Sequence, residues 1–217
     1  PHRGRRGDLA RAGGFGREVH AWLQHYAQAG NEVSIKGFLD DNTAALDEIV
    51  GLPPIIGGMR DYSLVPGDIL LSALGGPRLK LELYEYWKAK GAFFMTLIHP
   101  TAVIGQRVEI GEGSVLCPGV IVTADVAIGN MVTLNAACSV GHDAVIGDGC
   151  TLSGHADVTG YAQLGRGCFL GSHAVVTPNM RVGANAIVGA GSVVVRNVPD
   201  GATVFGVPAK QIAGFQD

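Results

Sequence analysis

The chain has 217 residues, of which 47% are hydrophobic, so it can bury the core of one large or two small domains without disulfides. Its 33 glycines and its low aromatic content, 6%, disfavour a helical bundle and favour many tight turns. A net charge of −3 argues against nucleic-acid binding, and no apolar run is long enough to span a bilayer. The four cysteines show no CxxC spacing, which predicts a soluble protein of a reducing compartment, the cytoplasm.

Residues 1–11 are rich in arginine and differ from the rest of the chain. No apolar stretch follows these arginines, so they do not form a signal peptide. The segment also lacks the apolar run that a first central strand requires. We therefore predict that this strand is poor or absent, and interpret residues 1–11 as a frame-shifted or foreign start joined to a regular domain at Ala12.

A glycine-rich stretch, Ala12-Gly13-Gly14-Phe15-Gly16-Arg17, precedes the first predicted helix, which covers residues 15–30. Backbone N–H groups in such a turn at the start of a helix can bind phosphate oxygens. The match to a nucleotide fingerprint is imperfect, because Arg11 occupies the place of its first glycine. A tight turn without a ligand is the alternative interpretation.

Strand and helix signals alternate as far as residue 98. Strands are predicted over residues 32–41, 68–73 and 93–98, and a second helix over residues 77–91. Asp40 and Asp41 end the strand that follows the glycine-rich turn, where a carboxylate can accept hydrogen bonds from a ribose or a base. We predict a small Rossmann-like βαβ domain with a parallel sheet over residues 1–97.

A six-residue period begins at Ile98 and continues to residue 199 without interruption. Each aliphatic position is followed four residues later by a small or modest side chain, which is cysteine three times. The aliphatic positions are Ile98, Ile104, Ile110, Leu116, Val122, Ile128, Leu134, Val140, Ile146, Leu152, Val158, Leu164, Leu170, Val176, Val182, Val188 and Val194. Glycine and asparagine recur in the turn slots between them, which require positive φ or close backbone approach.

A short strand and a tight corner every six residues build a triangular coil of three strands, and coils stack about 4.8 Å apart. The inward side chains fill the resulting prism, so a substrate has to bind outside it. We interpret the three inward cysteines as small buried hydrophobic residues. The pattern resembles the hexapeptide-repeat acyltransferases, which implies a left-handed parallel β-helix over residues 98–199, followed by a C-terminal loop over residues 200–217.

The order of the elements makes the resemblance more specific. The βαβ domain leads through the junction Leu97-Ile98-His99-Pro100-Thr101-Ala102 into the repeats, and Val204-Phe205-Gly206-Val207-Pro208-Ala209-Lys210 follows them. The chain resembles sugar acetyltransferases of the sialic-acid O-acetyltransferase, bacillosamine N-acetyltransferase and GDP-perosamine N-acetyltransferase type. This implies acetyl-CoA as co-substrate, a nucleotide-linked amino sugar as acceptor, a homotrimer with active sites between subunits, and a role in surface polysaccharide assembly such as that of lipopolysaccharide O-antigen.

His142 is the candidate general base. It lies in an outward corner slot two residues after Val140, and Asp143 beside it would raise the basicity of the imidazole and fix its tautomer. The alternative is a solvated surface pair. The resemblance supports catalysis, because a family motif falls on residues 135–143, and it implies a substrate contact at Asn135.

The resemblance also implies that the acyl donor lies along the later coils. Gly160 would donate its N–H to the thioester oxygen, which stabilises the developing oxyanion. Ser172 and Ala190 would make backbone contacts with the pantetheine arm. The remaining donor contacts are assigned to the terminal loop, at Gly206, Pro208 and Lys210, although Lys210 is equally compatible with a solvated charge.

His155 and His173 are eighteen residues apart, one full coil, so they are predicted to stack. Two stacked imidazoles are compatible with a zinc site like that of the γ-type carbonic anhydrases, which would need a third ligand. We favour a contact with the acceptor or the pantetheine arm, and we assign no metal.

The function predicted from these observations is N-acetylation of the 4-amino group of a nucleotide-linked sugar by direct attack on acetyl-CoA. The residues assigned to nucleotide binding are Gly13, Gly14, Phe15, Asp40, Asp41 and Gly75. Three alternatives remain: O-acetylation of a sialic-acid type of sugar, a zinc enzyme, and a non-enzymatic β-helix scaffold. The identity of the nucleotide, UDP, GDP or dTDP, stays open.

Overall fold

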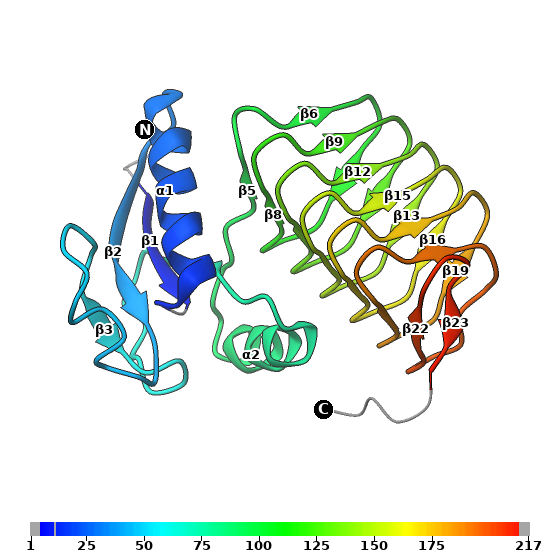
Figure 1. Cartoon of the computed structure of the whole chain (residues 1–217). Helices are drawn as coiled ribbons and strands as arrows, with labels where there is room; N and C mark the ends of the chain where they lie inside the picture. Colours follow the sequence, from blue (N-terminus) through cyan, green and yellow to red (C-terminus); the bar gives the residue numbers. More distant parts are fainter. Residues whose placement is uncertain (1–4, 11, 213–217) are drawn as a thin grey trace.

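The computed structural model describes residues 5–10 and 12–212, and begins with a parallel sheet of four strands in the order β3-β2-β1-β4 (Figure 1). Its elements are β1 (Arg5–Ala10), α1 (Gly14–Gln28), β2 (Val33–Leu39), β3 (Ile55–Gly57), β4 (Asp68–Ser72) and α2 (Pro77–Ala89). Helix α1 lies between this sheet and the first coils of a β-helix. The alternation of parallel strands with helices confirms the Rossmann-like fold predicted for this part of the chain.

Strand β1 shows that the prediction of a poor or absent first strand was wrong. Its backbone pairs in parallel with β2 on one side and β4 on the other, with a register shift between Gly7 and Asp8. Pairing on both sides satisfies the backbone groups whatever the side-chain composition, and local sequence patterns do not report it.

The third predicted strand, over residues 93–98, also differs from the structure. Phe94 makes only an isolated bridge to Leu70 of the sheet, and Leu97 already pairs with the β-helix. The segment is therefore the connection between the two parts of the fold. The short edge strand β3 was missed, because it has only three residues and pairs on one side.

The repeats form the left-handed β-helix, whose three faces are parallel sheets of eight, six and five strands, apart from the last, antiparallel pair of the eight-stranded face. The eight-stranded face consists of β5 (Leu97–Ile98), β8 (Val115–Leu116), β11 (Thr133–Leu134), β14 (Thr151–Leu152), β17 (Phe169–Leu170), β20 (Ile187–Val188), β22 (Thr203–Phe205) and β23 (Lys210–Gln211). The six-stranded face consists of β6 (Val103–Ile104), β9 (Ile121–Val122), β12 (Ser139–Val140), β15 (Asp157–Val158), β18 (Val175–Val176) and β21 (Val193–Val194). The five-stranded face consists of β7 (Glu109–Ile110), β10 (Ala127–Ile128), β13 (Val145–Ile146), β16 (Gln163–Leu164) and β19 (Arg181–Val182).

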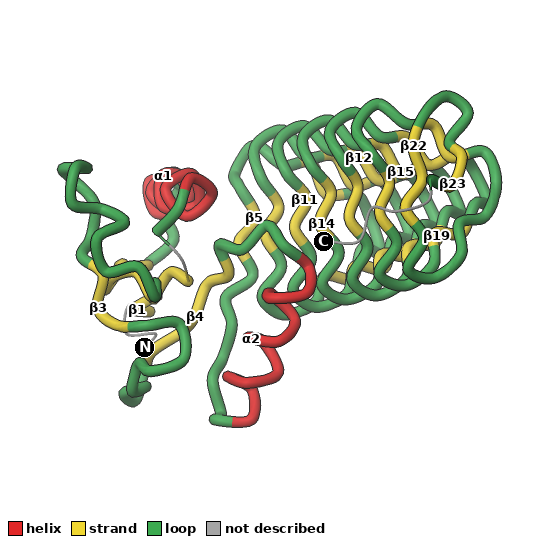
Figure 2. Tube along the Cα trace, turned by 60° about the horizontal axis from the view of Figure 1, so that its bottom comes forward, coloured by secondary structure: helices red, strands yellow, loops and turns green. Residues whose placement is uncertain are grey.

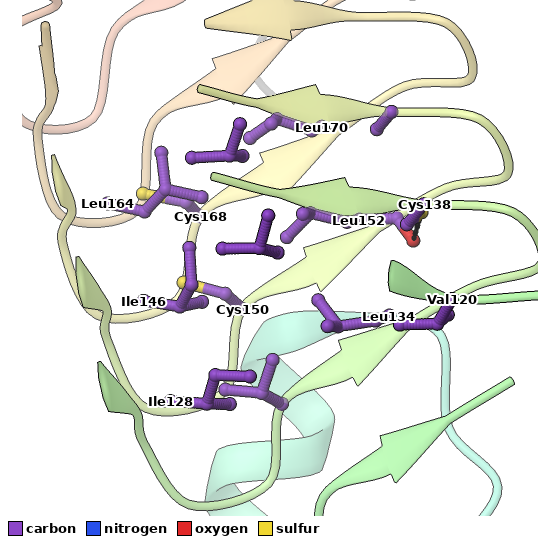
Figure 3. Close-up of a cluster of buried hydrophobic side chains, with 14 of the residues drawn as sticks. Val120, Ile128, Leu134, Cys138, Ile146, Cys150, Leu152, Leu164, Cys168 and Leu170 are labelled. Carbon is purple, nitrogen blue, oxygen red and sulfur yellow. Dashed lines mark hydrogen bonds between the residues drawn. The ribbon is translucent and has the colours of Figure 1, made fainter. Parts of the chain in front are cut away.

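The inward side chains fill the prism, as the repeat predicts. Leu134, Leu152 and Leu170 form one ladder, and Cys150 and Cys168 stack beside another (Figure 3). Each fully buried aliphatic side chain contributes on the order of 2 kcal/mol to stability. The interior offers no space to a substrate, so any site lies on the outer faces and edges.

Helix α2 packs against the eight-stranded face, close to β11 and β14 (Figure 2). Lys80 of α2 is fully buried there, and its Nζ donates to Thr133 Oγ1 at 2.9 Å, to Thr151 Oγ1 at 2.8 Å and to the Cys150 carbonyl at 3.1 Å. These bonds fix α2 on this face. Neither described helix has the length and apolar character needed to cross a membrane.

Candidate active site

The prism has three edges, two of which carry predicted site residues. We call the edge between the eight- and six-stranded faces the paired-histidine edge, because His155 and His173 lie on it. The edge between the six- and five-stranded faces carries His142 and is called the His142 edge. Corner residues in equivalent slots are eighteen positions apart and therefore stack along an edge.

The side chains of His142 and Asp143 contact each other on the His142 edge. Nδ1 of His142 lies 2.9 Å from Oδ2 of Asp143, and the two side chains are 58% and 41% exposed. Asp143 has a φ of 60°, a left-handed conformation that aspartate tolerates better than most residues. An imidazole whose Nδ1–H is held by a carboxylate keeps Nε2 as its proton acceptor.

Gly160 lies directly beside the His142 ring, one coil later. A Cβ atom on Gly160 would lie 2.9 Å from both Cε1 and Nε2 of His142, closer than real Cβ contacts come. A side chain at position 160 would therefore displace the His142 ring from its present position. The Gly160 amide donates no hydrogen bond within the described part of the chain.

Five of the other predicted residues lie together on the paired-histidine edge. The His155 and His173 rings stack with centroids 4.8 Å apart and an interplanar angle of 1°. Asn135, Ser172 and Ala190 occupy corners of the same edge. The amides of Ser172 and Ala190 donate no hydrogen bond to described residues, so this edge presents N–H groups outward.

The terminal loop continues the paired-histidine edge. The Gly206 amide donates to Ser192 Oγ at 3.0 Å, and the Gly206 carbonyl accepts from the Val193 amide at 3.0 Å. Pro208 and Lys210 are exposed, and Lys210 belongs to β23, which pairs antiparallel with β22. The loop thus lies at the end of the edge that carries Ser172 and Ala190.

The glycine-rich turn and Asp40 meet at the carboxyl ends of β1 and β2. Asp40 is only 7% exposed, and its carboxylate accepts from the Ala12 amide at 2.8 Å and from the Asn42 amide at 2.9 Å. Gly13 is the N-cap of α1 without a side-chain cap. Asp40 therefore holds the turn in shape, and its own oxygens are occupied.

Three further predicted residues surround this turn. Asp41 is exposed, and its Oδ1 accepts from the Met59 amide at 2.8 Å. Phe15 is half-buried and its ring meets that of Trp22 at 5.9 Å. Gly75 follows β4, and a Cβ there would have no neighbour within 4 Å, so the carboxyl edge of the sheet is open at this point.

The structure does not bring the glycine-rich turn and His142 together within one chain. Helix α2 covers the eight-stranded face, which the His142 edge does not border. The N-terminal sheet lies on the α2 side of the prism, and the His142 edge on the far side (Figure 1). The two halves of the predicted site therefore face different directions.

A cavity of about 770 Å³ lies between α2 and the later coils of the eight-stranded face. Its walls include Gly76, next to Gly75, and the apolar side chains of Leu81, Phe169 and Ile187. Arg166 and Glu85 pair across its rim. Sequence patterns do not indicate this cavity, because its walls come from two distant segments.

The aromatic neighbour of His142 was not predicted from the sequence. The ring of Tyr161 lies 5.1 Å from that of His142, centroid to centroid, at an interplanar angle of 90°. Tyr161 is eighteen residues after Asp143 and so shares its corner slot one coil later. The coil length of eighteen residues was the sequence signal from which this neighbour could have been predicted.

Among the described residues, the side chains that could bind a metal are dispersed and the thiols are buried. No three His, Cys, Asp or Glu side chains gather at one point in residues 5–10 and 12–212. All four cysteines are free and buried, and burial raises the pKa of the Cys138 thiol to about 11. A buried thiol of that pKa is a poor nucleophile at neutral pH.

Three known proteins show what the chain is similar to. It is 31% identical to PerB from Caulobacter crescentus, solved with CoA and GDP-perosamine, with a TM-score of 0.84 over 95% of this chain and 97% of that one. It is 30% identical to the acetyltransferase domain of PglB from Neisseria gonorrhoeae FA1090, solved with acetyl coenzyme A, with a TM-score of 0.85 over 97% of this chain and 100% of that one.

The third is the UDP-N-acetylbacillosamine N-acetyltransferase of Bacillus subtilis (strain 168), which is 32% identical over 108 residues. That match covers 48% of this chain and 47% of the relative, about half the length of each. No known family model matches the chain.

Proposed function

Because the chain belongs to the hexapeptide-repeat sugar N-acetyltransferases that include perosamine N-acetyltransferase and the PglB acetyltransferase domain, we propose that it transfers the acetyl group of acetyl-CoA to the 4-amino group of a nucleotide-linked sugar. The acceptor class follows from these relatives, one of which was solved with CoA and GDP-perosamine. Acetyl-CoA is the co-substrate, and the chain itself supplies the acid–base groups.

The observation that carries the mechanism is the contact between His142 and Gly160. The imidazole whose Nε2 can accept a proton and the glycine whose amide N–H has no partner in the described chain are neighbours on an exposed edge. Transfer from a thioester to an amine needs both a base for the ammonium proton and a donor for the oxyanion. The pair supports one reaction centre on the His142 edge.

The reaction then runs as follows. The neutral amine nitrogen attacks the thioester carbonyl carbon, a C–N bond forms, and the carbonyl oxygen becomes an oxyanion that the Gly160 amide stabilises. His142 Nε2 takes the proton from the amine nitrogen, while Asp143 holds Nδ1–H. The C–S bond breaks, and the CoA sulfur leaves and takes up the proton from His142. No acyl-enzyme forms, consistent with the buried thiols.

The nucleotide is assigned to the glycine-rich turn. Gly13 and Gly14 open α1, whose N-terminal amides attract phosphate oxygens. Arg17, in the first turn, extends to within 3.9 Å of the position of a Gly14 Cβ, and its charge complements a diphosphate. Asp40 shapes this turn, and Asp41, Phe15 and Gly75 remain at its rim.

We further propose that the site is completed by a second copy of the chain. His142 and the glycine-rich turn face opposite sides of one prism, so the sugar held by one copy has to reach the His142 edge of another. The pantetheine contacts on the paired-histidine edge and at Gly160 lie on two different edges, which two neighbouring prisms present to a common groove. In a closed homotrimer every copy has equivalent neighbours, so every site is completed in the same way.

The test is thiol release from acetyl-CoA with UDP-, GDP- and dTDP-linked 4-amino sugars, with His142→Asn beside the wild type. The proposal predicts turnover with one of these amines and a loss of at least about 100-fold in kcat for the variant. Turnover only with hydroxyl acceptors would replace it by sugar O-acetylation. If the wild-type protein did not bind acetyl-CoA, the non-enzymatic scaffold would be favoured. If the purified protein contained zinc, the zinc enzyme would be favoured.

The same proposal includes a cytoplasmic location and a trimeric state. The four free, buried cysteines suit a reducing compartment. Light scattering of the purified protein measures the oligomeric state, and a monomer that turns over at the full rate would contradict the shared site.

A further inference from the structure

Tyr161 contacts the imidazole of His142 from the next coil. The ring centroids are 5.1 Å apart and the planes are perpendicular, the edge-to-face arrangement that aromatic pairs favour. The backbones are also joined, because the Tyr161 amide donates to the His142 carbonyl at 2.9 Å. The coil register therefore places the two residues side by side.

Tyr161 adopts a backbone conformation that is unusual for a bulky residue. Its φ is 60°, in the left-handed region, where a residue with a large side chain is a genuine outlier. The same slot holds Asn179, with a φ of 64°, one coil later. The corner itself imposes this conformation, because Arg107, Asp125 and Asp143 adopt it in the preceding coils of the same column. What distinguishes Tyr161 is the contact of its ring with His142.

Two other residues also contact the His142 imidazole. Asp143 holds Nδ1, and Gly160 lies against Cε1 and Nε2. Asp125 stands one coil before Asp143 in the same column, and its carboxylate pairs with Arg107, so it does not compete for the histidine. Tyr161 is the third neighbour of the His142 side chain, which remains 58% exposed.

We propose that Tyr161 is a positioning residue of the transfer reaction, whose ring holds the His142 imidazole with Nε2 beside the Gly160 amide. The inference rests on the proposed function for His142 as the base. An exposed imidazole rotates about two bonds, and only one of its orientations presents Nε2 to the acceptor amine. The Tyr161 ring removes the other orientations before the substrates bind.

Two substitutions separate the ring from the hydroxyl and from the backbone strain. Tyr161→Phe keeps the ring, and kcat is expected to stay within about twofold of the wild type. Tyr161→Asn introduces the residue that the same slot carries at position 179, so the backbone is tolerated while the ring is lost. We expect kcat to fall about tenfold with the KM for acetyl-CoA within about twofold, because positioning acts on the chemical step.

A second readout does not depend on turnover. In the ligand-free protein, ¹⁵N NMR of labelled histidines, assigned with His142→Asn, reports the tautomer and the order of the His142 ring. The wild type and Tyr161→Phe are expected to show one ordered Nδ1–H tautomer. Tyr161→Asn is expected to show averaged tautomers and broadened signals. If this variant does not fold, Tyr161→Ala replaces it, since Ala137 adopts the same conformation.

The outcomes distinguish this inference from the proposed function. Wild-type kcat and unchanged NMR signals in Tyr161→Asn overturn the positioning role, even if His142 is essential. An equal loss in Tyr161→Phe and Tyr161→Asn would assign the effect to the hydroxyl and also overturn it. If the wild type acetylates no amino sugar, the proposed function fails, while the NMR experiment still decides whether Tyr161 orders the ring.

Discussion

Replacing Gly160 by alanine is the sharpest test of the reaction centre. The added Cβ would lie 2.9 Å from Cε1 and Nε2 of His142 and 3.3 Å from Cδ2. Carbon atoms in optimal contact are about 3.5 Å or more apart, so the ring has to move by at least about half an ångström. The methyl group leaves the Gly160 amide in place but displaces the base beside it.

The expected result is a fall in kcat of about 30- to 100-fold, because a displacement approaching 1 Å is worth about 100-fold when reacting groups are aligned. Stability is expected to change by less than about 1 kcal/mol, since Gly160 does not have a positive φ and alanine reduces the entropy of the unfolded chain. The assay is steady-state thiol release from acetyl-CoA with the best acceptor, together with thermal unfolding.

Gly154→Ala is the matched control. Gly154 occupies the same corner slot on the paired-histidine edge, and a Cβ there would meet only the Ala136 carbonyl oxygen, at 3.5 Å. Its kcat is expected to stay within about twofold of the wild type. If Gly160→Ala also turned over at the wild-type rate, the His142 ring would not be held against Gly160 during the reaction, and the assignment of this corner would be wrong.

Three further predictions follow from buried polar groups. Burial lowers the pKa of Lys80 from 10.5 to about 7, so between about pH 7 and pH 10.5 the unfolded chain binds the proton that the folded one lacks. The free energy of unfolding of the wild type, measured in urea, should therefore rise across this window by up to about 5 kcal/mol relative to that of Lys80→Met. If the difference in unfolding free energy between the two proteins did not change with pH, the burial argument would be wrong. Burial, and then the neighbouring His25, lower the pKa of His99, so the stability associated with the neutral ring is present above about pH 6.5 and lost as the pH falls below it. Between pH 7.5 and 5.5, His99→Gln should therefore lose less free energy of unfolding than the wild type. Equal losses in the two proteins would exclude this cause. Asp40→Asn should weaken binding of the matching nucleoside diphosphate about tenfold in calorimetry, because one of the two backbone amides that Asp40 accepts from loses its acceptor. An unchanged affinity would show that Asp40 does not support the nucleotide site.

The candidate site was predictable wherever the coil length alone decides position. His155 and His173 stack because they are eighteen residues apart, and His142 and Gly160 meet for the same reason. Tyr161 was accessible by the same arithmetic. The contact of Asp40 with the Ala12 amide was not, because it depends on how two strands of the N-terminal sheet end side by side.

The sequence by itself determined the β-helix, because each hexad specifies its own strand, its own corner and one inward side chain, and identical units stack in a single way. It did not determine β1, whose backbone is paired by β2 and β4 from segments up to 62 residues distant, as in the pairing of Arg6 with Asp68. Only the tertiary structure decided that α2 covers the eight-stranded face and that His142 lies on the opposite edge. Those positions depend on contacts such as Lys80 with Thr151, 71 residues away, and no local pattern encodes a contact between surfaces that the chain brings together only when it is folded.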